Sequence, residues 1–105
     1  MWEPMAQLLV LYNPPADPAV FDAYYQQTHA PLAKTLPGLR SYTINEGPVQ
    51  ALAGTAPYLV ATLIFDSIAD VQAALVSPEG QATAGDLPNF ALAGVTLLML
   101  ETKAA

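Results

Sequence analysis

The chain contains a single histidine, His29, within the segment YYQQTHAPLAKTLPG of residues 24–38. An unperturbed imidazole has a pKa of ~6.5 and can accept a proton from an activated carbon or a phenol at neutral pH. Tyr25 precedes it by one helical turn and, like Tyr12, could hold a carbonyl or phenolate oxygen by hydrogen bonding. His29 and Tyr25 are therefore the candidate catalytic residues.

Pro31 should shape the surroundings of His29. Proline has no N–H group, so the carbonyl of Gln27 loses its helical donor and Ala30 is pushed away from helical angles. We expect the helix to kink or pause here and to leave a small polar niche beside the imidazole. Alternatively, His29 is partly exposed and only stabilises the end of a helix through the helix dipole.

Further aromatic and polar residues could line a ligand cavity around His29. Tyr12 and Asn13 end the first predicted strand, beside the expected cavity mouth, although an Asn-Pro turn also explains Asn13. Tyr42 lies on the second predicted strand, where packing against the sheet is the alternative. The candidate ligand-binding residues are Tyr12, Asn13, Phe21, Tyr42, Asp86 and Phe90.

Asp86, Asn89 and Phe90 lie in a stretch that glycine and proline interrupt. Polar residues that favour turns are usual at such places. The alternative is a flap that holds Phe90 over the cavity, because binding residues often lie on loops. Tyr24 should point about 100° away from Tyr25, toward solvent or a partner.

The composition argues against several kinds of chemistry. One histidine and no cysteine argue against a structural zinc site, which needs three or four ligands. The first strand is followed by NPPADP and not by a Gly-rich phosphate loop, and no serine stands in a nucleophile elbow. Three basic and nine acidic residues give a net charge of −6, so nucleic acid and anionic membranes are poor partners.

Four strand-like segments alternate with helical ones, in an order that predicts the fold. Asp17 and Pro18 favour the start of the first helix, and Asp66 or Ser67 caps the second. A short, broken helical stretch should follow over residues 78–90. The order β-α-β-β-α-β predicts a ferredoxin-like α+β fold with a four-stranded antiparallel sheet. The predicted strands are residues 6–13, 39–47, 58–65 and 95–101, and the predicted helices are residues 18–36 and 67–76.

Three of the strands are apolar at successive positions, so both faces of the sheet need burial. Two helices can cover only one face of a four-stranded sheet. A two-fold partner that packs sheet against sheet would cover the other. We expect a homodimer, with Leu9, Val10, Leu63 and Leu98 among the residues that face the partner.

The length of 105 residues predicts one domain, residues 1–105. No apolar run approaches the ~20 residues that span a bilayer. The start MWEPMAQ lacks the basic residues of a signal peptide, so we expect a cytoplasmic protein. Trp2 is interpreted as a surface anchor or tail residue.

The segments LYNPPADPAVFDAYYQQTHAPLAKTLPGLRSY, SPEGQATAGDLPNF and VTLLMLE resemble the EthD family of the dimeric α+β-barrel superfamily. The resemblance covers nearly the whole chain. It implies two ferredoxin-like subunits whose sheets join into one barrel, each with a cavity between its sheet and helices. The family is named after a gene cluster for degrading ethyl tert-butyl ether, and some members are called reductases. Superfamily relatives include polyketide cyclases, muconolactone isomerases, quinol monooxygenases and heme-degrading enzymes.

Three functions are compatible with these residues. The first is a cofactor-free enzyme or binding protein for a small hydrophobic, oxygenated ligand, with His29 as base. The second is heme binding with His29 as axial ligand, which is disfavoured because the heme-degrading relatives carry their histidine on the second helix. The third is a non-catalytic dimeric accessory protein in which His29 is structural. We expect the first, with no cofactor and a small hydrophobic or aromatic ligand.

Overall fold

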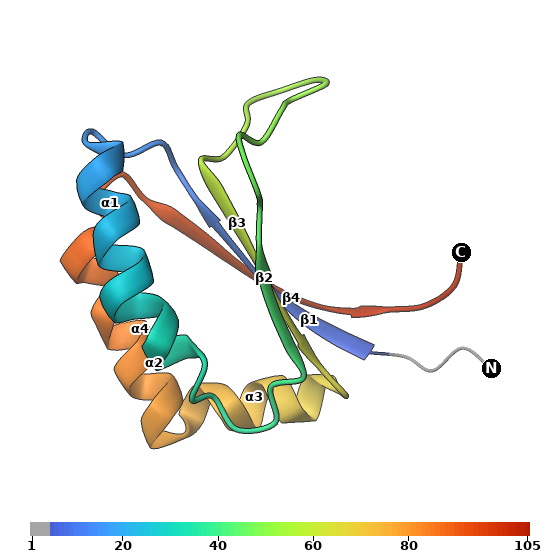
Figure 1. The fold of residues 1–105 in the computed structure, drawn as a ribbon. Coiled ribbons are helices and arrows are strands. Elements are labelled where there is room, and N and C mark those ends of the chain that lie inside the picture. Colours follow the sequence, from blue (N-terminus) through green and yellow to red (C-terminus); the bar gives the residue numbers. More distant parts are fainter. Residues whose placement is uncertain (1–4) are drawn as a thin grey trace.

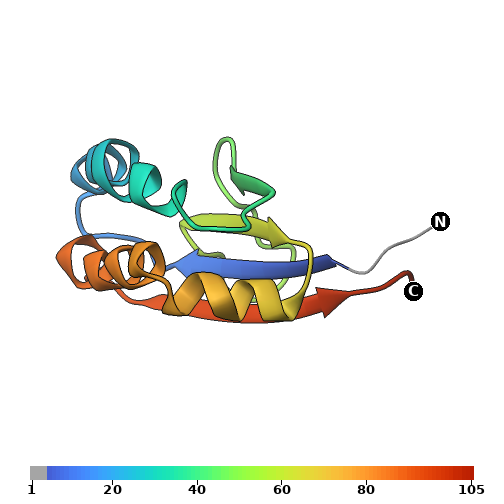
Figure 2. The same cartoon turned by 90° about the horizontal axis from the view of Figure 1, so that it is seen from below.

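The four strands form one antiparallel sheet that carries helices on a single face (Figures 1 and 2). The computed structural model describes residues 5–105, so Trp2 lies outside the described residues. The strands are β1 (Met5–Tyr12), β2 (Ser41–Ile44), β3 (Leu59–Phe65) and β4 (Val95–Thr102). Their order, β2-β3-β1-β4, places β1 between β3 and β4. This arrangement confirms the predicted ferredoxin-like α+β fold.

The helix-covered face of the sheet forms the core. Alternate residues of β1 and β3 are buried because successive side chains of a strand point to opposite faces. Val10 and Leu63 belong to this buried set, so the expectation that they face a partner is wrong. The buried strand residues are Ala6, Leu8, Val10, Tyr12, Leu59, Ala61, Leu63 and Phe65.

The opposite face of the sheet is apolar, and none of the described helices covers it (Figure 1). Leu9 of β1 pairs with Leu98 of β4 on this face, and Leu98 is 47% exposed. These two residues lie on the side of the sheet where a partner is expected. We call this surface the open face.

The first helical region runs without interruption but changes its geometry at the centre. It consists of α1 (Pro18–Tyr24), a π-helical turn η1 (Tyr25–His29) and α2 (Ala30–Ala33). Asp17 caps its start by accepting a hydrogen bond from the Val20 N–H. The expectation that Ala30 leaves helical angles is wrong, since its φ of −60° and ψ of −42° are helical. The wider π turn makes room for a proline ring that would collide with a carbonyl in an α-helix.

The second helical region is longer and more regular than the sequence indicates. Ser67 caps α3 (Ile68–Val76), and Ser77 caps α4 (Pro78–Phe90) by accepting a hydrogen bond from the Gly80 N–H. The prediction of a broken stretch over residues 78–90 is wrong. Proline suits the first helical position, and Pro88 lies in the last turn of α4, where the helix loses the N–H hydrogen bond of this one residue and still continues to Phe90. No helix within residues 5–105 is long and apolar enough to cross a membrane.

Candidate active site

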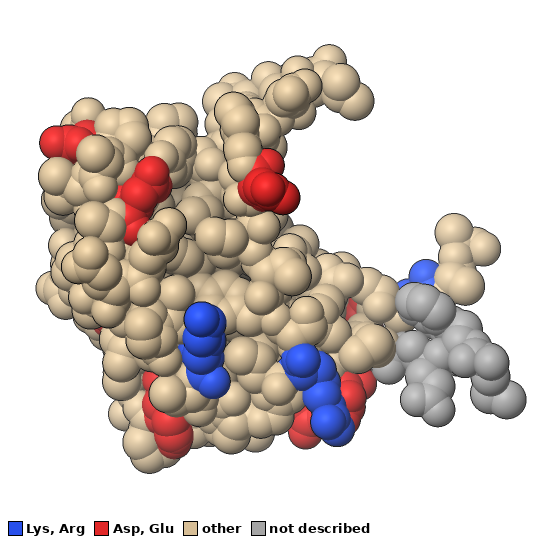
Figure 3. All heavy atoms as spheres, in the orientation of Figure 1, with Lys and Arg blue, Asp and Glu red and all other residues tan. Residues whose placement is uncertain are grey.

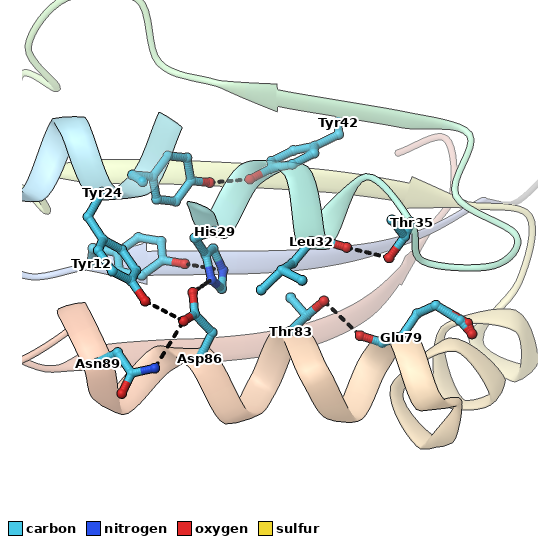
Figure 4. Close-up of polar contacts among 11 residues, drawn as sticks. Tyr12, Tyr24, His29, Leu32, Thr35, Tyr42, Glu79, Thr83, Asp86 and Asn89 are labelled. Carbon is cyan, nitrogen blue, oxygen red and sulfur yellow. Dashed lines mark hydrogen bonds and ion pairs between the residues drawn. The ribbon is translucent and has the colours of Figure 1, made fainter. Parts of the chain in front are cut away.

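His29 lies in the interior between the first helical region and the sheet. Its side chain comes from the last residue of η1 and the residue is only 4% exposed. The Nδ1 atom lies 3.0 Å from Oδ2 of Asp86 in α4, and the Nε2 atom lies 3.3 Å from the Tyr12 hydroxyl at the end of β1 (Figure 4). Both ring nitrogens are therefore engaged by side chains from distant parts of the sequence.

The carboxylate of Asp86 decides which nitrogen of His29 carries the proton. Burial by itself would raise the pKa of Asp86, but hydrogen bonds from Tyr24, Asn89 and His29 outweigh it and hold the pKa below its usual value. An ionised carboxylate can only accept hydrogen bonds, so Nδ1 of His29 donates. Nε2 is left with a free lone pair that accepts from the Tyr12 hydroxyl.

The surroundings of His29 favour the neutral form of its imidazole. Burial lowers its pKa, and this effect exceeds the opposite effect of the Asp86 hydrogen bond and charge. A neutral imidazole with an available lone pair is the form in which histidine acts as a base. The lowered pKa favours this form of His29.

Tyr12 completes a hydrogen-bonded chain with His29 and Asp86. The residue is 1% exposed. Burial is the largest cause of the raised pKa of its hydroxyl, and the electrostatic effects of Tyr42 and Asp86 raise this pKa further. Tyr12 therefore remains a protonated donor at neutral pH. A hydroxyl, an imidazole and a carboxylate in this order can pass a proton and stabilise the charged imidazolium that results.

Tyr24 lies in the site, contrary to the expectation that it faces solvent or a partner. Its hydroxyl donates to Oδ1 of Asp86 at 2.6 Å, and the same oxygen accepts from the Asn89 amide at 3.1 Å. The helix face 100° from Tyr25 meets α4, because α1 and α4 lie side by side on the sheet (Figures 1 and 2). No local sequence signal links Tyr24 to Asp86, which is 62 residues away.

Tyr25 lies near His29 but does not bond to it. The two rings are 5.5 Å apart, and the Tyr25 hydroxyl forms a hydrogen bond with the Tyr42 hydroxyl of β2. Burial raises the pKa of both tyrosines. Tyr42 therefore does more than pack against the sheet, because it supplies a polar partner at the cavity wall.

The remaining candidates divide into aromatic neighbours and one surface residue. Phe90 lies 4.6 Å from the His29 ring and belongs to α4, not to a loop flap. Phe21 packs edge-on against Tyr12 at 5.5 Å. Asn13 is exposed and donates to the Ala93 carbonyl, which ties the end of β1 to the start of β4. The structure does not bring Asn13 into the site.

An apolar inner cavity of about 90 Å³ borders this chain of hydrogen bonds. The polar groups at its wall belong mainly to His29 and three tyrosines. Asp86 and Phe90 stand behind His29 and do not line it. The main lining residues are Leu8, Val10, Tyr12, Tyr25, His29, Ala33, Leu36, Tyr42, Ala61, Leu63, Thr83, Leu87 and Leu97. Residues 5–105 contain no group of three or more acidic, histidine or cysteine side chains that could hold a metal ion.

A ferredoxin-like sheet, one helical layer and an apolar cavity beside a buried histidine define a small α+β protein with an internal site. The EthD domain model matches residues 13–93. The chain belongs to the EthD family.

Similar proteins support the same assignment. A protein of Rhodococcus erythropolis, described as an uncharacterised 11.0 kDa protein in the thcB–thcC intergenic region, is 40% identical over 94% of this chain and 96% of its own length. The crystal structure of an EthD family protein from Bacillus halodurans is 32% identical, with a TM-score of 0.85 over 94% of this chain and 99% of that one. A dimeric ferredoxin-like protein of unknown function from Thermobifida fusca is 14% identical, with a TM-score of 0.68 over 93% and 91%. This last match concerns the fold alone.

Proposed function

We propose that the protein binds a small hydrophobic, oxygenated ligand in the inner cavity and transfers a proton with His29 as base. One observation carries this proposal. The Asp86 carboxylate fixes the proton on Nδ1, so the Nε2 lone pair of a neutral imidazole lies beside the Tyr12 hydroxyl at the wall of an apolar cavity. Catabolic or biosynthetic pathways of aromatic and polyketide-like compounds supply ligands of this kind.

The proposed step is the removal of a proton from carbon or oxygen of the ligand. The Tyr12 hydroxyl turns from Nε2 to the ligand oxygen, and Nε2 accepts the proton. The electron pair of the broken C–H bond moves onto the ligand oxygen, where Tyr12 donates a hydrogen bond to the developing charge. Asp86 stabilises the imidazolium that forms. Isomerisation, cyclisation and cofactor-independent oxidation can all begin with this step.

Heme binding is a weaker candidate for the same site. An axial ligand needs a free imidazole nitrogen, but both nitrogens of His29 have side-chain partners. The inner cavity of about 90 Å³ is also far smaller than a porphyrin. These observations favour a site that works without heme.

We further propose that the protein is a homodimer whose subunits meet through the open face. Leu9 and Leu98 lie there, uncovered by the described helices. A stable interface buries on the order of 1,200–2,000 Å² in total. The neighbour from Thermobifida fusca is described as dimeric and has the same fold, which supports a dimer.

A comparison of the parent with His29→Gln tests the catalytic proposal. Glutamine keeps the size and a hydrogen-bonding tip, so the free energy of unfolding should change by about 1–2 kcal/mol or less. Turnover of a ligand should fall by roughly 10²–10⁴-fold, the usual contribution of a positioned base. Thermal shifts measured with phenols, quinones and small polyketide-like compounds would identify the ligands to use.

Thr35→Val is the matched control for this experiment. It removes a polar group that bonds only to the Leu32 carbonyl at a helix end, outside the cavity. It should retain the thermal shifts and the turnover of the parent. If His29→Gln also retains both for every compound that binds, the role that we assign to His29 is wrong.

A further inference from the structure

A second and larger cavity lies next to the inner one. This outer cleft has a volume of about 570 Å³ and separates the first helical region from the connection between β2 and β3. Figure 3 shows a recess between these parts, bordered mainly by uncharged residues. The lining residues include Asp22, Tyr25 and Gln26 of the helical region, and Ile44 and Tyr58 on the side of the connection.

Tyr25 and Tyr42 stand between the inner cavity and a hollow that adjoins the outer cleft. Tyr25 lines the cleft and the inner cavity, and Tyr42 lines the inner cavity. The hollow of about 350 Å³ is lined by both tyrosines and shares Gln26 and Ile44 with the cleft. The hydrogen bond between the two tyrosine hydroxyls therefore lies where the inner and outer spaces meet.

The inner cavity alone is too small for most ligands of proteins. Typical sites for small molecules measure ~300–1,000 Å³, whereas the inner cavity has about 90 Å³. It can accept the end of a molecule but not its whole length. The outer cleft is within the usual range and adjoins the cavity at Tyr25.

We propose that the outer cleft is a second ligand-binding subsite, which holds the extended, uncharged part of a ligand. The oxygenated end of that ligand passes between Tyr25 and Tyr42, whose hydrogen bond opens, and reaches His29 in the inner cavity. This inference rests on the proposed function and adds the class of ligand to it. The class is an uncharged phenol or related oxygenated ring with an apolar extension.

The charges at the cleft select against anionic ligands. Among residues 5–105, Asp22 is the only charged residue that lines the cleft. Both oxygens of its carboxylate accept from the Tyr58 hydroxyl, at 2.9 and 3.0 Å. No basic residue lines the cleft, and Lys34 lines only the smaller hollow. An uncharged extension avoids repulsion from Asp22 and can pack on the exposed side chain of Ile44.

A series of 4-alkylphenols tests the subsite by isothermal titration calorimetry. In the parent, the affinity should rise about two- to fourfold for each methylene from 4-ethylphenol to 4-hexylphenol. Ile44→Trp and Gln26→Trp fill the cleft from opposite walls, at exposed positions where folding is not at risk. Both variants should lose this dependence on chain length. Leu92→Trp, at an 83% exposed position outside the cleft, should retain it.

The passage between the tyrosines is tested by stopped-flow measurements with 4-hexylphenol. Tyr42→Phe removes the hydrogen bond that has to open, so the association rate constant should increase about five- to tenfold. Anionic 6-(4-hydroxyphenyl)hexanoate carries its charge at the end of the extension, where it meets Asp22, and should bind the parent at least about tenfold more weakly than 4-hexylphenol, as one unfavourable charge contact implies.

Three results would overturn the inference: no binding by any phenol, an unchanged dependence on chain length in both cleft variants, or equal association rates in the parent and Tyr42→Phe. Failure of the proposed function has a different signature. In that case His29→Gln converts or binds every phenol as the parent does, whatever its chain length.

Discussion

Nδ1 of His29 lies 3.0 Å from Oδ2 of Asp86, although 57 residues separate them in the chain. The contact joins the π turn η1 to α4. It is almost entirely shielded from solvent, because His29 is 4% exposed and Asp86 is 7% exposed. It sets the tautomer of the imidazole and so decides which nitrogen faces the cavity. The first prediction concerns this contact.

Asp86→Asn should release the tautomer of His29. The amide cannot act as an ionised acceptor for Nδ1–H, so the proton should distribute between both nitrogens. The free energy of unfolding should fall by about 1–3 kcal/mol, because Tyr24 and His29 lose a charged partner. Nitrogen NMR of the untagged protein can measure the tautomer directly, since the chain has one histidine. A ring with its proton still wholly on Nδ1 in the variant would contradict this prediction.

Stability should depend on pH through His29. Burial lowers its pKa in the folded protein, so below ~6.5 the unfolded chain binds more protons than the folded one. The free energy of unfolding should therefore decrease as the pH falls through 6.5 toward the lower folded-state pKa. His29→Gln should reduce this slope, because its side chain does not titrate. Urea denaturation between pH 7.5 and 5 measures both proteins, and parallel curves would show that His29 does not cause the dependence.

A charge on the open face should dissociate the proposed homodimer. Leu98→Lys places an ammonium group in the expected sheet-to-sheet interface, where burial of an unpaired charge is costly. Sedimentation equilibrium at micromolar concentration should give a dimer for the parent and a monomer for the variant. Val20→Lys is the control, because Val20 is 65% exposed on α1 and lies away from the open face. A parent that sediments as a folded monomer would remove the proposed interface.

Two glycines of α4 should respond in opposite ways to alanine. A Cβ at Gly80 would lie 2.0 Å from the Ala74 carbonyl oxygen, so Gly80→Ala requires the backbones of α3 and α4 to separate. It should cost more than about 2 kcal/mol, as overpacking does. Gly85 has no atom within 4 Å of its Cβ position, and Gly85→Ala should stabilise α4 by about 0.5–1 kcal/mol. Thermal and urea unfolding measure the stability of both variants. A change of the same sign for Gly80→Ala and Gly85→Ala would contradict this prediction.

Much of the fold follows from local patterns in the sequence. Asp17 and Ser67 cap helices where the sequence predicts them, because capping depends on neighbouring N–H groups. Three strand predictions are confirmed to within one residue at each end, because long apolar runs favour buried strands. The prediction of a strand over residues 39–47 is wrong in its length, since β2 pairs with β3 only over Ser41–Ile44. The same patterns indicate that His29 and Tyr25 share one helix face.

Other features depend on elements that meet only in three dimensions. Pro31 predicts a disturbance of the helix, but packing against the sheet and α4 decides that it becomes a π turn with Ala30 still helical. Gly80 looks like a helix breaker in the sequence, yet it is required where α3 and α4 approach closely. Local propensities are worth only about 1 kcal/mol each, so such contacts override them.

The sequence by itself therefore determines the sheet, the helical layer and the place of the one histidine in the first helical region, whereas its burial follows from the packing. The tertiary structure decides the chemistry around that histidine. Tyr24 and Asp86 are 62 residues apart, and Tyr12 and His29 are 17 apart. A hydrogen bond needs its two atoms within about 3 Å and well aligned. Only the packing of α1, η1, α4 and β1 brings these side chains near that distance.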